Sequence, residues 1–125
     1  MEGYSQQIKA FLEFLKDCEE ANQIAASVEA DMDLRTQDIL HNMELRENSQ
    51  YDYICQGIAL KDIRKRRRKA KDTKEITDLI CDWSASRRGI IKELEQLLGK
   101  VRKAEKRTSN RIYIDKTDVL KTLLE

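Results

Sequence analysis

The stretch RENSQYDY, Arg46 to Tyr53, is predicted to form the turn on which the fold depends. Asn48 is suited to end one helix. The Ser49 side chain can cap the first turn of the next helix, and Asp52 would lie near the positive end of its dipole. The sequence on both sides has helical periodicity and contains no proline. The chain is therefore expected to double back near Asn48.

Before this turn, apolar residues recur at three- and four-residue steps, which is typical of one face of a long helix. A helix over about residues 4–46 would be about 60 Å long at ~1.5 Å per residue. Such a rod in a small chain favours a coiled-coil hairpin over a compact globule. Asn22 interrupts the stripe, and a polar residue in a seam between helices can fix their register. The stripe consists of Ile8, Phe11, Leu15, Cys18, Ala25, Met32, Ile39 and Met43.

After the turn, the pattern predicts a second helix over about 50–84 and a third over about 87–107, followed by a C-terminal appendage, 108–125. In the appendage, RIYI (111–114) reads as a short extended segment, and a last short helix contains Leu120, Leu123 and Leu124. The leucines of that helix are expected to dock on the bundle or on another subunit, since so short a helix is not stable alone.

Residues 1–125 are thus expected to form a single all-α domain. Its core is a long antiparallel hairpin, and a third helix packs on it, as in a coiled coil or a three-helix bundle. The third helix should cover the end of the hairpin where apolar residues are densest. That end contains Phe11, Phe14, Leu15, Ile80 and Trp83.

Charge is abundant but balanced, because 38% of the residues are charged and the formal net charge is only +1. Any affinity for nucleic acid must therefore come from an uneven distribution of charge. The run IRKRRRKAKD, 63–72, has seven cationic side chains in ten residues. In a hairpin bent near Asn48, this run faces acidic residues of the first helix. Consecutive cationic residues wrap all round a helix, so one or two of them, Arg66 or Arg67, should point toward the seam. The structural ion pairs predicted on this basis join Arg64, Arg66 or Arg67 to Glu29, Asp31 or Asp33.

The remaining cations of this run are expected to stay in water, where they are candidates for binding a partner. A second basic cluster lies near the end of the third helix. Stacking on nucleic-acid bases usually requires several aromatic residues, and this chain has few. The cationic candidates are Lys65, Arg68, Lys69, Lys71, Lys100, Arg102, Lys103, Lys106 and Arg107. Apolar candidates at the uncovered hairpin tip are Met43, Tyr51 and Tyr53.

No enzyme motif is present, so we expect no catalytic residues, no cofactor and no metal site. The single histidine, His41, has no nearby cysteine in sequence with which to bind a metal. Cys18, Cys55 and Cys81 are far apart and read as reduced thiols of a cytoplasmic protein. No segment has the apolar run of a signal peptide or a membrane span, so no membrane association is expected.

The segments TQDILHNMEL (36–45), IRKRRRKAKD (63–72) and LLGKVRKAEKR (97–107) followed by RIYI resemble a family of small helical proteins from phages and prophages of Gram-positive bacteria. The resemblance covers 36–114 and implies a phage accessory protein in the host cytoplasm that binds and modulates a host or phage protein. By analogy, some phage proteins of this size inhibit defence enzymes such as CRISPR nucleases. The alternative is a nucleic-acid-binding accessory factor that uses 64–71 and 100–107. A homodimer formed through the uncovered tip is also expected.

Overall fold

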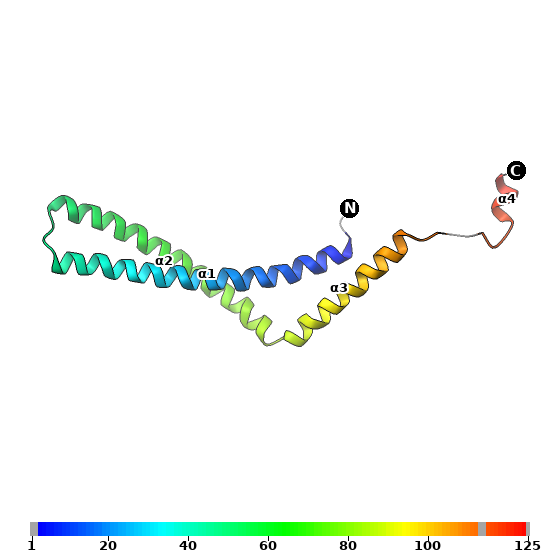
Figure 1. Cartoon of the computed structure of the whole chain (residues 1–125), viewed down its shortest axis with the longest axis horizontal. Coiled ribbons are helices and arrows are strands. Elements are labelled where there is room, and N and C mark those ends of the chain that lie inside the picture. The colour runs from blue at the N-terminus through cyan, green and yellow to red at the C-terminus, as the bar shows by residue number, and fades with distance from the viewer. Residues whose placement is uncertain (1–2, 113–114, 125) are drawn as a thin grey trace.

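The computed structural model describes residues 3–112 and 115–124, and the prediction of an all-α protein is confirmed (Figure 1). Neither described range contains a strand. Arg111 and Ile112 belong to no helix or strand, while Tyr113 and Ile114 of the expected extended segment lie outside the described residues. The helices are α1 (Tyr4–Leu45), α2 (Gln50–Ala85), α3 (Arg88–Ser109) and α4 (Val119–Leu124).

The connection between α1 and α2 is held by reciprocal hydrogen bonds. The Ser49 hydroxyl accepts a bond of 3.1 Å from the Asp52 amide, and the Asp52 carboxylate accepts one of 2.9 Å from the Ser49 amide. This capping box satisfies amides that the first turn of α2 leaves free, and its hydrogen bonds lower the pKa of Asp52. The Asn48 side chain donates to the carbonyl of Asn42 and accepts from Gln56, so it joins the two helix ends.

α1 and α2 pack closely along a seam of small and medium-sized residues. The buried residues Cys18, Ala25 and Met32 of α1 are spaced by seven, and so are Ile63, Ala70 and Thr77 of α2. Seven-residue spacing keeps a seam facing its partner when two helices supercoil. In the view of Figure 1, α2 crosses α1 about halfway along, and the two helices then diverge toward the start of α1.

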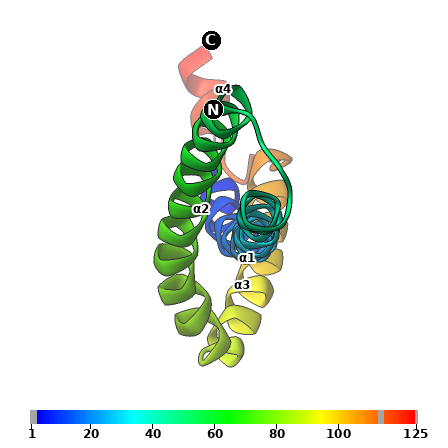
Figure 2. The same ribbon diagram turned by 90° about the vertical axis from the view of Figure 1, so that its left-hand side faces the viewer.

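α3 lies along the N-terminal part of α1, on the side opposite α2 (Figure 2). Leu12 and Leu15 are buried at this end, but Phe11 and Phe14 are 42% and 48% exposed and Trp83 is 39% exposed. The expectation that α3 covers all of this end was therefore only partly right. Successive helical residues point about 100° apart. A helix that covers Leu12 and Leu15 therefore leaves their neighbours Phe11 and Phe14 partly exposed to water.

The short helix α4 buries none of its described residues. Leu120, Leu123 and Leu124 are 47%, 74% and 85% exposed. Figure 1 shows α4 apart from the other helices. Its leucines therefore do not dock on the helices of their own chain.

Met32 should contribute more to stability than any other apolar residue of the seam, because only 1% of its surface is exposed. Met32→Ala is expected to lower the free energy of unfolding by about 2–3 kcal/mol, since it removes buried methylenes and leaves a cavity. Leu34→Ala, at a position that is 61% exposed, should change it by less than about 0.5 kcal/mol. Urea denaturation followed by circular dichroism measures both. Equal effects would show that Met32 does not anchor the seam.

Candidate functional site

The basic run of α2 meets α1 through one arginine. Arg67 Nε lies 2.6 Å from Asp33 Oδ1, and Arg67 Nη2 lies 3.7 Å from Glu29 Oε1. Only 19% of the Arg67 side chain is exposed, so its charge is partly removed from water and needs these partners.

The other predicted members of this network lie elsewhere. Asp31 pairs with Arg35 of its own helix at 3.0 Å, and Arg64 and Arg66 are exposed without an ion pair among the described residues. Because a helix turns about 100° per residue, only one of several consecutive arginines can face the seam. In the structure, the arginine that faces the seam is Arg67.

A second polar contact crosses the seam at Asn22. The Asn22 side-chain amide donates to Asp78 Oδ1 at 2.7 Å and to the buried Thr77 hydroxyl at 3.0 Å, while Lys74 Nζ donates to Asp78 Oδ2 at 3.0 Å. The hydrogen bond from Asn22, followed by that from Lys74, lowers the pKa of Asp78. The hydrogen bond to Asp78 raises the pKa of Lys74. The sequence pointed to Asn22 as a register residue, but its partners on α2 could not be named without the structure.

The remaining cations of the basic run form an exposed surface on α2. Lys65, Arg68, Lys69 and Lys71 are all exposed. The cations of the second cluster, Lys100, Arg102, Lys103, Lys106 and Arg107, are exposed on α3. Figure 1 shows the middle of α2 and the end of α3 at separate places along the molecule, so the two clusters do not form one patch.

Beside the exposed cations of α2, an apolar groove runs between α1 and α2. Its volume is about 440 Å³. The groove was not among the features predicted from the sequence. The sequence did contain a signal for an apolar surface here, because Ile24 and Val28 are one helical turn apart and lie outside the buried stripe of α1. The groove is lined by Ala21, Ile24, Ala25, Val28, Arg66, Lys69, Ala70 and Thr73.

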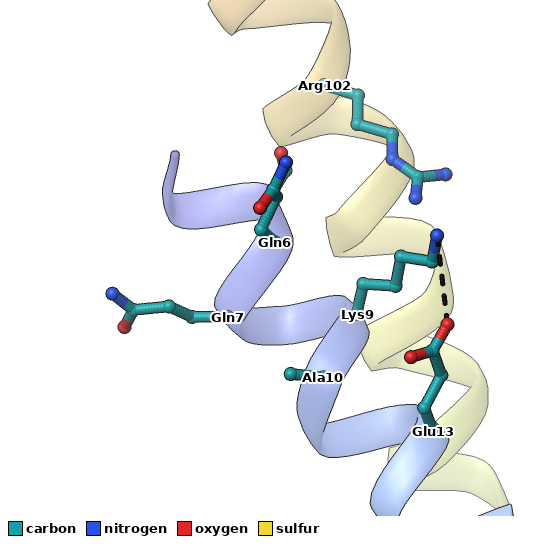
Figure 3. Close-up of a pocket in the computed structure, with 7 residues that line it drawn as sticks. Gln6, Gln7, Lys9, Ala10, Glu13 and Arg102 are labelled. Carbon is teal, nitrogen blue, oxygen red and sulfur yellow. Dashed lines mark ion pairs between the residues drawn. The ribbon is translucent and has the colours of Figure 1, made fainter. Parts of the chain in front are cut away.

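A polar cleft lies where α3 meets the start of α1 (Figure 3). Lys9 and Glu13 of α1 form an ion pair of 3.7 Å, and Arg102 of α3 extends toward them. The Glu105 carboxylate of α3 accepts a hydrogen bond of 3.5 Å from the Ser5 amide, one of the free amides at the start of α1. Of these contacts, the one between Ser5 and Glu105 joins α3 to α1, so the simplest role of this cleft is structural.

The end of α1 and the start of α2, on either side of their connection, present apolar side chains to water. Tyr51 and Tyr53 are 73% and 45% exposed, Ile58 is 68% exposed, and Met43 is half-buried.

No group of three His, Cys, Asp or Glu residues in the described part of the chain could hold a metal ion. Across 3–112 and 115–124, none of the helices combines the length and the apolar character needed to cross a membrane.

The described residues show no arrangement of a nucleophile and a base. His41 is exposed, and the three cysteines are free. Burial raises the pKa of the Cys81 thiol, which opposes formation of a reactive thiolate.

No known protein family, curated protein or solved structure matches this chain significantly.

Replacing Arg67 should destabilise the contact between α1 and α2 more than replacing Arg64, which is exposed on the same helix. Arg67→Ala leaves the half-buried Glu29 without its cation, and we expect a loss of roughly 1–2 kcal/mol. Arg64→Ala, at an exposed position, should change the free energy of unfolding by less than about 0.5 kcal/mol. Chemical denaturation of both variants in low salt measures the difference. If both variants matched the unaltered protein, the Arg67 pairs would contribute nothing.

The lowered pKa of Asp78 predicts a dependence of stability on pH. The unfolded chain binds a proton at Asp78 near the ordinary value of 3.8, and the folded chain binds it only at lower pH. The contribution of Asp78 is therefore complete above pH 3.8 and is lost as the pH falls through the folded pKa. Between about pH 5 and about pH 2, the unaltered protein should lose more stability than Asp78→Asn. Denaturation midpoints at several pH values test this, and parallel pH profiles would contradict it.

Proposed function

We propose that this protein is not an enzyme and acts by binding and modulating another protein through the faces of its helices. In this proposal α1 and α2 form an antiparallel hairpin, on which α3 packs as the third helix of a small bundle. The observation that supports it is the amount of apolar surface left in water. Leu45, Tyr51 and Ile58 at the hairpin tip are 76%, 73% and 68% exposed. Several exposed apolar side chains at one end of a molecule favour contact with another protein.

The shape of the surface favours a protein partner over a small molecule. Pockets for small ligands are deep and bury most of the ligand. The hollows on this molecule are open grooves along helices, such as the one at the tip that is lined by Ile39, Asn42 and Leu45. An amphipathic helix of a partner can lie in a groove of this form and use contacts at three- and four-residue steps.

The resemblance to phage and prophage proteins supports a setting for this binding. In that setting the protein is a phage accessory factor in the host cytoplasm, and its partner is a host or phage protein. Host defence factors, CRISPR nucleases among them, are the first class to test. This setting rests on the resemblance alone and not on a residue with a known role.

The second candidate is a nucleic-acid-binding factor. It is favoured by the exposure of Lys65, Arg68, Lys69 and Lys71, because exposed cations can neutralise phosphates. Each phosphate contact releases counterions, so this mode of binding weakens steeply as salt rises. An interface formed by apolar side chains depends little on salt.

Two matched triple variants distinguish these candidates. Tyr51→Gln with Ile54→Gln and Ile58→Gln removes apolar surface at the tip, and Lys65→Gln with Arg68→Gln and Lys71→Gln removes exposed charge. All six positions are exposed, so both variants should keep the helical content of the unaltered protein.

In affinity capture from a Gram-positive host lysate, we expect a protein partner to be retained by the unaltered protein and the charge variant. The tip variant should lose it, and retention should persist in high salt. A gel-shift titration with duplex DNA at two salt concentrations tests the alternative. A shift that weakens steeply with salt and disappears in the charge variant would replace the proposed function by nucleic-acid binding.

A further inference from the structure

The apolar groove and the polar contacts lie on opposite sides of the seam between α1 and α2. Asn22 and Arg67 make their hydrogen bonds and ion pairs on one side. Ile24 of α1 and Lys69 of α2 line the groove on the other side, two positions further along each helix. Two residues correspond to about 200° of rotation, which carries a side chain to the far side of the helix. The polar side is satisfied within the chain, and the groove side is open.

The open side extends beyond the groove with regular spacing. Ile76 is 63% exposed and follows Lys69 by seven residues, so the two share a face of α2. On α1, Ile24 is 56% exposed and shares its face with Glu20, four residues earlier, and Asp31, seven residues later. The open face therefore has an apolar centre, with acid on α1 and base on α2.

The charges of the two helices are complementary but mostly unused within one chain. α1 contains nine Asp and Glu residues and three Lys and Arg residues. Residues 61–74 of α2 contain nine Lys and Arg residues and two Asp and Glu residues. Among the described contacts between these helices, only Arg67 forms ion pairs. A second copy could bring its acidic α1 over the basic part of α2, and its basic α2 over α1.

The surface area of the chain also points to a missing partner. The accessible surface is 10648 Å². A compact monomer of 14.7 kDa would expose about 6,900 Å². The chain thus exposes about 3,700 Å² more than a compact monomer would, partly because α4 buries none of its described residues, and obligate dimers bury about 1,000–2,500 Å² on each partner.

We propose that a second copy of this chain covers the open face, so that α1 of each copy lies over α2 of the other. A two-fold axis parallel to the helices produces this arrangement, and the same residues then contribute from both copies. Ile24, Val28 and Ile76 form the apolar centre, and Arg66 and Lys69 face acidic residues of the other α1. The alternative two-fold, with α1 on α1, is opposed because it juxtaposes two acidic helices.

This dimer is separate from the proposed binding of another protein at the hairpin tip. The sequence predicts self-association at the tip, whereas the dimer proposed here uses the groove face. The two surfaces can therefore be tested by different variants. The outcome at the groove does not depend on whether a partner binds at the tip.

The first test measures the mass of the full-length protein in solution by sedimentation velocity and light scattering. We expect twice 14.7 kDa for the unaltered protein. Ile24→Glu should give a monomer with unchanged helical content, because Ile24 is 56% exposed within one chain. The matched control is Leu40→Glu, at a position that is 49% exposed in a different groove beside Asp33 on the polar side. This control should remain a dimer.

A charge exchange tests the orientation. One chain carries Glu20→Lys with Asp31→Lys, and the other carries Arg66→Glu with Lys69→Glu. Each variant alone should be predominantly monomeric, because its α1 and α2 faces have the same sign of charge. Mixed together they should form a heterodimer, since both α1-over-α2 contacts then join opposite charges.

Several outcomes would overturn the inference. A monomer at all concentrations would show that no second copy covers the face. A dimer that is unaffected by Ile24→Glu would place the interface elsewhere, and so would equal dissociation by Ile24→Glu and Leu40→Glu. If the charge variants dimerise alone and gain nothing from mixing, the α1-over-α2 orientation is wrong.

Discussion

The fold depends on a narrow seam in which residues spaced by seven on α1 meet residues spaced by seven on α2. Ala25 and Ala70 are small enough for the helix backbones to approach closely, and Met32 and Ile63 fill the space nearer the connection. Apolar contact of this kind has little directional specificity, so it does not by itself select one register. Asn22 and Arg67 supply that selection, because each would lose its hydrogen bonds if the helices slipped by a turn.

A seam between two helices can bury only one stripe of each. The rest of each helix faces water unless another element covers it, and α3 covers only the N-terminal part of α1. This geometry explains why large apolar residues such as Leu34, Ile58 and Leu79 remain exposed although the chain has a well-defined buried stripe. The function must therefore be inferred from the exposed faces of the helices, because paired helices form too few layers to enclose a pocket.

The sequence predicted the helices and the turn because both signals are local. Ser49 and Asp52 are three residues apart, and their capping box needs only the geometry of one turn. The identity of the arginine at the seam depended instead on the exact rotation of α2, and a difference of one residue turns a side chain by about 100°. Periodicity could indicate that one arginine faces acid, but it could not choose Arg67 over Arg66. The path of α3 was harder still, because its direction follows from the bend at Arg87 and from no pattern within the helix itself.

The distribution of charge is best understood from what one chain leaves unpaired. A helix with nine carboxylates and a helix segment with nine cations could have been placed to neutralise each other within the chain, yet they meet at Arg67 alone. Exposed ion pairs are worth little, so selection for stability is a weak reason to keep such segregated charge. Segregation has a clearer effect between molecules, where it favours one orientation of approach and opposes the others. The sequence of α1 and α2 thus specifies how the two helices pack with each other. The charges that stay unpaired favour one orientation of approach by another molecule.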